Sequence, residues 1–303
     1  MSRGADARGA DSSVHARFRP FHPGQRSSGQ QGSPVDSRLR RNDGEGVAFP
    51  SRGVPDAHCH LTTLPDAEAA VVEAIAAGVT PILAVAMEPA EFAPGFALRR
   101  RFPGHVLAGV GIHPSRVPTL DDAALATELA AVECAAAAAD FVGEVGLDYK
   151  DAPDAAQQHR QREALDRQLS IAEARRLPVN LHTRRADSDL IAVAANFTRR
   201  TGIPALLHWF THSRKLARQA TEAGLYLSAG PSILFDPRQA EVAAAIEPDF
   251  LLVETDSPVA YGGEPAKPAW ALRVATALAR ARGDAIEVMQ ARLTANLARF
   301  MYR

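Results

Sequence analysis

Residues 54–61 read Val-Pro-Asp-Ala-His-Cys-His-Leu, a short apolar run that ends in two histidines separated by one residue. Seven further short apolar runs follow along the chain, at 79–86, 106–112, 140–147, 178–182, 204–210, 225–229 and 250–255. They are rich in Leu and β-branched residues, and most are entered through Pro or Gly. Continuous apolar runs of this length are typical of strands covered on both faces, which predicts a parallel sheet.

Longer stretches with amphipathic helical spacing separate these runs, at 66–77, 88–101, 121–139, 154–176, 186–200, 213–223, 236–246 and 265–282, and a last one covers 285–301. Several begin with Asp or Ser, residues that commonly cap the start of a helix. Strands that alternate with helices in this way predict an α/β fold, a (β/α)8 TIM barrel. An open sheet with fewer strands is the alternative.

The overall composition narrows the class of protein. The chain has 303 residues, a net charge of −1 and two cysteines, Cys59 and Cys134. Near-neutral charge argues against a protein that wraps long nucleic acid, but it allows an enzyme that contacts a few phosphates. So few cysteines exclude a disulfide framework, and we expect a cytoplasmic protein. With neither a secretory signal nor a run of about 18 apolar residues, no membrane partner is expected.

The first 50 residues differ in composition from the rest. They contain eight Arg and five acidic residues, many Gly, Ser, Gln and Pro, and few apolar residues. Such a segment buries too little apolar surface to fold, so we expect a disordered basic tail at 1–50 and the barrel at 51–303. The tail is a solvated segment, a basic arm that touches nucleic acid, or an upstream stretch outside the natural product.

Polar side chains stand where the expected strands end. They are His58, His60, His113, Glu144, His182, His208 and Asp256. A barrel gathers the carboxyl ends of its strands around one point, so these side chains converge there. His58 and His60 are two residues apart on one strand and therefore face the same way. Burying so many polar groups without partners would cost folding free energy, so the pattern predicts a metal site in which they are ligands.

Imidazole and carboxylate ligands suit Zn²⁺, Mn²⁺ or Fe²⁺, and the carboxylates also tolerate Mg²⁺. His58, His60, Glu144, His182, His208 and Asp256 are too many ligands for one tetrahedral ion, so we expect two divalent ions. Glu144 offers two oxygens and can bridge them. Two such ions generate a hydroxide and clamp a phosphoryl group. Asp256 then holds one ion, takes the proton of the attacking water, or does both.

The strand-end motifs, taken in order, resemble those of the TatD family of metal-dependent hydrolases, mostly deoxyribonucleases. The resemblance rests on Asp56-Ala57-His58-Cys59-His60-Leu61, 111–114, 143–148, 182–184, 208–210 and 254–258, and it covers about 54–303. It implies the amidohydrolase-like type of barrel. It also implies that His58, His60 and Asp256 hold one metal, that Glu144 bridges, and that His182 and His208 hold the second.

The chain departs from that family's pattern in the loops that rim the site. Thr62-Thr63 stands where members usually carry an acidic residue or His, and 259–268 lacks the usual Arg and Asn. The segments 208–210 and 228–232 resemble a branch that includes the QatD nucleases of bacterial anti-phage cassettes. These loops leave the substrate preference open.

Three residues are candidate substrate contacts. Arg184 can bind a phosphate or form a salt bridge at the rim, and Trp209 can stack on a base or pack under its loop. His113 is expected to contact a phosphate or a leaving group. Asp148 either orients a metal ligand or caps the following turn, and Cys59 is expected to be a buried thiol.

Three functions follow from these observations. The first is a metal-dependent deoxyribonuclease that trims single-stranded DNA from an end, like a 3′–5′ exonuclease. The second is a barrel hydrolase of small-molecule or aminoacyl-RNA esters or amides. The third is a nuclease-like subunit of a multiprotein anti-phage complex, with protein partners encoded beside it.

Overall fold

The computed structural model describes residues 53–302, so the tail expected at 1–50 lies outside the described residues. Eight described strands form one sheet in chain order, and each pairs in parallel with the next. They are β1 (Val54–Cys59), β2 (Val79–Ala84), β3 (Val106–Val110), β4 (Phe141–Asp148), β5 (Val179–Arg184), β6 (Ala205–Leu207), β7 (Tyr226–Ala229) and β8 (Leu251–Val253). All eight expected strands are present.

The two ends of the sheet meet between β1 and the residues that follow β8. The backbone N–H of Asp256 donates to the carbonyl of His58 at 2.9 Å, and that of His60 donates to the carbonyl of Ser257 at 2.9 Å. The buried carboxylate of Asp56 also accepts from both the N–H and the hydroxyl of Thr255. These contacts close the sheet into a ring, which confirms the predicted (β/α)8 barrel.

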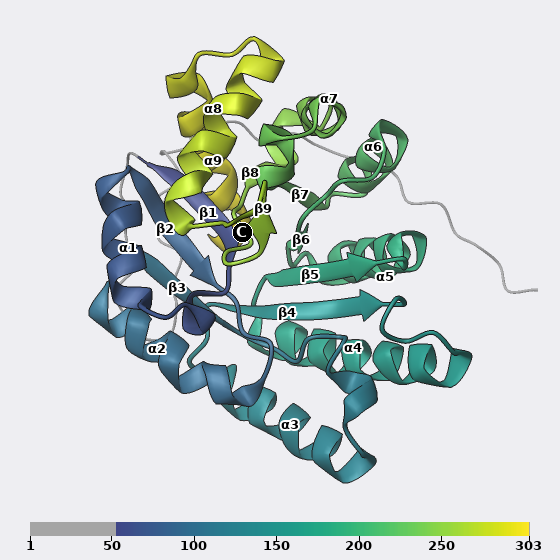
Figure 1. The fold of residues 1–303 in the computed structure, drawn as a ribbon. Coiled ribbons are helices and arrows are strands. Elements are labelled where there is room, and N and C mark those ends of the chain that lie inside the picture. The colour runs from purple at the N-terminus through teal and green to yellow at the C-terminus, as the bar shows by residue number, and fades with distance from the viewer. Residues whose placement is uncertain (1–52, 303) are drawn as a thin grey trace, which may run out of the picture. The chain divides into compact units, whose positions relative to one another are not determined.

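Helices surround the strands (Figure 1). They are α1 (Ala67–Ala76), α2 (Phe92–Arg101), α3 (Asp122–Ala135), α4 (Ala155–Arg175), α5 (Asp187–Thr201), α6 (Arg214–Glu222), α7 (Pro237–Ala244), α8 (Ala271–Arg282) and α9 (Ile286–Tyr302). The expected caps are present: Asp66, Asp121, Asp154 and Ser213 each accept a hydrogen bond from the backbone N–H three residues on. No helix of the described part is long and apolar enough to cross a membrane.

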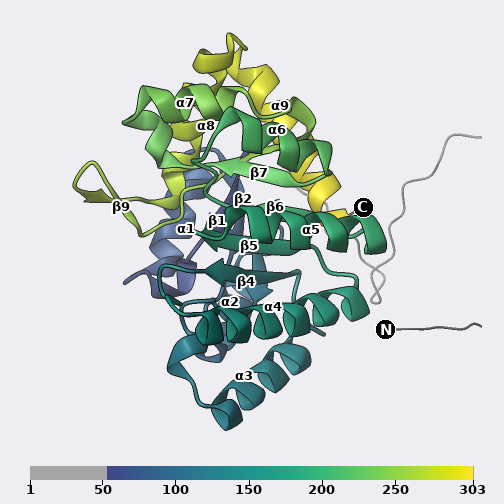
Figure 2. The same ribbon diagram turned by 90° about the vertical axis from the view of Figure 1, so that its right-hand side faces the viewer.

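Helix α9 covers the amino ends of the strands. Asn296 donates to the carbonyls of Pro248 and Leu251 at the start of β8, both at 2.7 Å. The buried ring of Phe300 packs edge-on against Tyr226 of β7, with centroids 5.5 Å apart. Figure 2 shows α9 and the C-terminus opposite the end toward which β4 and β7 point. Apolar side chains therefore fill one end of the barrel, and the polar side chains gather at the other.

The segment after β8 differs from the expectation. A helix was expected from 265, but a short antiparallel hairpin of β9 (Ala260–Tyr261) and β10 (Glu264–Pro265) precedes α8. Gly262 and Gly263 form its two-residue turn with φ of +60° and +90°, a left-handed backbone that glycine adopts without strain. A short 3₁₀ turn, Pro268–Trp270, then leads into α8. The hairpin lies on the same side as the carboxyl ends of the strands (Figure 2).

Candidate metal centre

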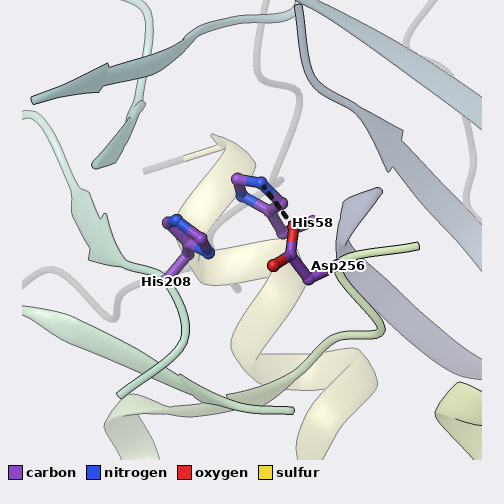
Figure 3. A group of neighbouring side chains, drawn as sticks. All are labelled: His58, His208 and Asp256. Atoms are coloured by element: carbon purple, nitrogen blue, oxygen red, sulfur yellow. Dashed lines mark ion pairs between the residues drawn. The ribbon is translucent and has the colours of Figure 1, made fainter. Parts of the chain in front are cut away.

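The fold brings all six expected metal ligands together. His58 lies in β1, Glu144 in β4 and His182 in β5. His60 directly follows β1, His208 directly follows β6, and Asp256 lies just beyond β8. All six lie at the carboxyl ends of the strands, and five of them are buried. Figure 3 shows the rings of His58 and His208 face to face beside Asp256, and their centroids are 3.8 Å apart.

Glu144 lies between two groups of histidines, and each of its oxygens faces one group. Oε2 is 3.5 Å from Nε2 of His58 and 3.4 Å from Nε2 of His60. Oε1 is 2.8 Å from Nδ1 of His182, 2.9 Å from Nε2 of His208 and 3.3 Å from Nε2 of His113. A carboxylate in this position can contribute one oxygen to each of two cations.

Asp256 belongs to the first of these groups. Its Oδ1 is 3.5 Å from Nε2 of His58 and 3.2 Å from Nε2 of His60. The side chain is directed there by a left-handed backbone, with φ of +50°, a conformation that Asp and Asn tolerate better than most residues. His58, His60, Glu144 and Asp256 therefore form one nitrogen and oxygen ligand set.

The charges at this centre favour an ionised Glu144. Burial alone raises the pKa of this carboxyl, but the adjacent His113, His58 and His208 outweigh burial and hold its pKa well below the usual range. Burial lowers the pKa of His208, yet Glu144 and Glu254 outweigh it and raise that pKa well above its ordinary value. A histidine binds a metal only without the extra proton of its charged form, so a cation would replace protons on these rings as the partner of Glu144.

The donor atoms also fit a divalent metal by position. Three overlapping groups have ligand atoms within 4.8 Å of one another: His58 with His208 and Asp256, His58 with His60 and Glu144, and His113 with Glu144 and His182. Imidazole nitrogens with carboxylate oxygens are the ligands of Zn²⁺, Mn²⁺ and Fe²⁺ sites. The residues present therefore fit a metal centre of this type.

His113, expected to contact substrate, lies within the candidate metal cluster. Its Nε2 faces Glu144, and its Nδ1 is 2.6 Å from the hydroxyl of Ser115. The ring meets that of His182 edge-on, with centroids 4.4 Å apart. The geometry makes His113 a candidate ligand as well as a candidate substrate contact.

Arg184 and His182 share a contact with Asp148. Oδ2 of this buried carboxylate is 3.3 Å from Nε2 of His182 and 3.4 Å from Nη1 of Arg184. Its Oδ1 accepts hydrogen bonds from the backbone N–H groups of Lys150 and Asp151, and these bonds cap the following turn. Asp148 thus caps the following turn and also contacts the candidate ligand His182, and Arg184 has 41% of its side chain exposed.

Trp209 is held at the mouth of the site next to His208. Its backbone N–H donates to Oε1 of Glu254 at 2.7 Å, and its φ is +48°. Its ring lies 5.2 Å from that of Tyr261 at 42°. Trp209 therefore contacts the hairpin after β8.

Sequence reasoning missed two residues that support the centre. Asn180 of β5 is fully buried; its amide donates to the carbonyl of Ala57 at 2.9 Å, and its Oδ1 is 2.9 Å from Nδ1 of His58. Glu254 is also buried and accepts from Ser228 and Trp209 beside His208. The available signal for Asn180 was an amide two residues before His182, on the same face of a buried strand.

Cys59 and three further histidines of the described part lie outside the candidate metal cluster. Cys59 is buried, as expected. His159 is exposed on α4 beside Glu163, and His105 contacts the hydroxyl of Thr80 at 2.9 Å. Nε2 of His212 lies 2.8 Å from Oδ1 of Asp187 at the start of α5.

Comparisons with known proteins establish the family. The family model described as TatD related DNase matches residues 55–302. The chain belongs to the TatD family. It is 34% identical over 251 residues to the uncharacterized metal-dependent hydrolase YjjV of Escherichia coli, which covers 78% of this chain and 94% of that protein. It is 32% identical over 220 residues to human deoxyribonuclease TATDN3, covering 68% of this chain and 78% of that one.

Solved structures agree with the TatD fold. The crystal structure of E. coli YjjV aligns with a TM-score of 0.72 and 30% identity, over 82% of this chain and 97% of that one. A TatD family hydrolase from Entamoeba histolytica aligns at 0.71 with 16% identity, over 83% and 98%, a likeness of fold alone. The chain is therefore a TatD-type metal-dependent hydrolase with candidate metal-binding residues at the carboxyl ends of its barrel strands.

Proposed function

We propose that this TatD hydrolase is a deoxyribonuclease that trims single-stranded DNA from an end, like a 3′–5′ exonuclease, with two divalent ions. The position of Glu144 carries the proposal. Its two oxygens face two separate groups of imidazoles, which suits a pair of ions rather than one. The relative named deoxyribonuclease TATDN3 supports a phosphodiester as the substrate.

In this proposal six side chains hold the metals. His58, His60 and Asp256 would hold one ion and His182 and His208 the other, and Glu144 would offer one oxygen to each. When bound, the ions supply electrophilic stabilisation of a phosphoryl group and a lowered pKa for a water molecule. Asp256 would also accept a proton from the attacking water, since a carboxylate can act as a general base and its Oδ1 lies in the cluster, 3.2 Å from Nε2 of His60.

Three side chains at the rim are assigned to the substrate. Arg184 binds a phosphate oxygen with the part of its guanidinium that does not face Asp148. His113 donates to a phosphate or leaving-group oxygen if it does not bind metal, and Trp209 stacks on a base. A near-neutral chain suits an enzyme that grips a strand end with few phosphate contacts.

The test uses the full chain and end-labelled single-stranded DNA. We expect cleavage with Mg²⁺, Mn²⁺ or Zn²⁺ that stops with a chelator and in Asp256→Asn, with products that shorten stepwise from the 3′ end. DNA that stays intact with every metal contradicts the proposal. In that case the same assay with small carboxylic esters and aminoacyl-RNA tests the other bond types that the rim loops leave open.

A further inference from the structure

Three neighbouring loops each place an aromatic side chain on one side of the mouth. Trp209 follows β6, Phe235 follows the 3₁₀ turn Pro231–Leu234 after β7, and Tyr261 lies in the hairpin after β8. The rings of Trp209 and Tyr261 are 5.2 Å apart. Phe235 lies against the tip of the same hairpin: a Cβ placed on Gly262 would be only 2.6 Å from Cε1 of Phe235. We call Trp209, Phe235 and Tyr261 the aromatic wall.

The backbone fixes this wall in place. The N–H of Ala266 donates to the carbonyl of Val259 at 3.0 Å, and the hydroxyl of Ser257 donates to the carbonyl of Ala266 at 2.7 Å, which holds the base of the hairpin. At the tip, a side chain larger than hydrogen at Gly262 would displace Phe235. The wall is therefore a preformed surface that needs little ordering when a ligand binds.

The wall begins at the metal centre. Trp209 directly follows the candidate ligand His208, and both contact Glu254: the backbone N–H of Trp209 at 2.7 Å and Nδ1 of His208 at 3.5 Å. The hydroxyl of Tyr261 approaches the same carboxylate across Gly230. A molecule whose phosphate is held at the candidate metal centre would therefore have these rings beside its next chemical group.

The outer part of the wall is open. Phe235 is 50% exposed and Val259, at the base of the hairpin, 37%, and both belong to the few large apolar side chains of the described part that are exposed. At the end of β5, the strand next to β6, Arg184 offers a cation with 41% of its side chain exposed. Flat aromatic rings beside a cation and a phosphate-binding centre are the elements with which proteins bind single-stranded nucleic acid.

We propose that the aromatic wall is a base-stacking subsite, in which Phe235 and Tyr261 extend the platform begun by Trp209 and bind the unpaired nucleobases next to the cleaved phosphate. This inference rests on the proposed nuclease function and names the part of the substrate that the rim recognises. Every base has a flat face, so the subsite distinguishes a base-bearing strand from a backbone without bases rather than one sequence from another.

The test compares two strands of equal length and charge, a deoxythymidine hexamer and its abasic counterpart, both with phosphorothioate linkages that slow cleavage. Fluorescence anisotropy measures their affinity for the metal-loaded full chain. We expect the wild type to prefer the thymidine strand by about tenfold or more, since one base–aromatic stack contributes a factor of about 5 to 150. Phe235→Ala should lower that preference at least about fivefold, and Phe235→Trp should keep it.

The matched control is Val72→Ala, because Val72 is an apolar side chain of α1 with 57% exposure. This variant should keep the wild-type preference. A wild type that binds both strands equally, or a Phe235→Ala variant with undiminished preference, overturns the subsite. Cleavage of ordinary DNA by the wild type is measured in parallel. If the wild type cleaves DNA but shows no preference for bases, only the subsite is contradicted. If it prefers the thymidine strand but does not cleave DNA, only the nuclease function is contradicted.

Discussion

At the scale of single residues, Asp256 has a chemical role in the proposed function and few side-chain interactions that stabilise the fold. Its carboxylate lies within 3.5 Å of Nε2 of both His58 and His60, while its backbone N–H donates to the carbonyl of His58. The left-handed φ of +50° restricts which substitutions are informative, because Ala is strained there and Asn is not.

Asp256→Asn is therefore predicted to lose activity and keep the fold. The amide retains size and backbone preference but neither accepts a proton nor binds a cation as well, so we expect turnover to fall by about 10²- to 10⁴-fold. Steady-state kinetics on the cleaved substrate measure this loss. A melting temperature in chelator that differs from wild type by more than a few degrees would show that the side chain is structural.

Asn180 is predicted to set the tautomer of His58. Its Oδ1 accepts from Nδ1–H, because its own amide is committed to the carbonyl of Ala57, and this leaves the lone pair of Nε2 to face Glu144 and Asp256. Asn180→Leu removes the acceptor, so we expect metal affinity to fall about 10- to 100-fold in a chelator-competition titration. Asn180→Asp keeps the acceptor and should bind metal more tightly than Asn180→Leu. Equal affinities in the two variants would contradict the assignment.

At the scale of elements, the junction between β1 and β8 depends on side chains as well as on the sheet. Asp56 accepts from the backbone and the hydroxyl of Thr255, and burial raises the pKa of its carboxyl well above the ordinary value despite these hydrogen bonds. Because β8 ends at Val253, these bonds extend the contact between the two strands up to the metal centre.

Weakening this junction should destabilise the barrel. Asp56→Ala leaves two donors of Thr255 buried without a partner, which costs about 2–5 kcal/mol of unfolding free energy. Thr255→Val removes the hydroxyl that donates to Asp56 and accepts from the backbone N–H of Ser257, and should cost about 1–3 kcal/mol. Thr255→Ser keeps the hydroxyl and should stay within about 1 kcal/mol of wild type. Urea denaturation measures all three. A loss in Thr255→Ser as large as in Thr255→Val would show that packing, not the hydrogen bond, holds the junction.

At the scale of the whole molecule, the candidate metal centre joins residues that lie in or just after six strands: β1, β3, β4, β5, β6 and β8. Cations bound there would link these strand ends and offset the charge of two buried carboxylates. Metal that binds to the folded state and not to the unfolded state therefore raises the free energy of unfolding.

Metal removal is predicted to lower the melting temperature of the full chain. At a free metal concentration of about 100 times Kd, binding contributes about 2.7 kcal/mol, which for a domain of this size corresponds to roughly 5–10 °C. Differential scanning fluorimetry with and without chelator measures the shift. Glu144→Gln, which alters the ligand shared by both groups, should show a much smaller shift. A chelator effect of equal size in that variant would place the metal elsewhere.

Much of the fold and of the candidate site was predictable from the sequence because both follow from local pattern. Eight apolar runs, each followed by an amphipathic stretch, specify strands and helices through periodicity, and a barrel places every strand end at one point. His58, His60, Glu144, His182, His208 and Asp256 were recognisable because each is a polar residue within such a run or directly after it. The Asp and Ser caps were equally local, since a cap acts within three residues.

The remaining features depend on tertiary structure, because they join residues far apart in the chain. Asn180 meets His58, and Asp56 meets Thr255, only when β1 lies beside the later strands, and nothing next to either residue indicates its partner. The aromatic wall needs three loops to converge, and the hairpin at Gly262 and Gly263 has too short a strand on each side to produce a pattern. The sequence alone thus determined the barrel and the residue types at its mouth. Only the packing of distant segments decided that Glu144 faces two groups of histidines and that His113 joins them, because those distances depend on strand order and register.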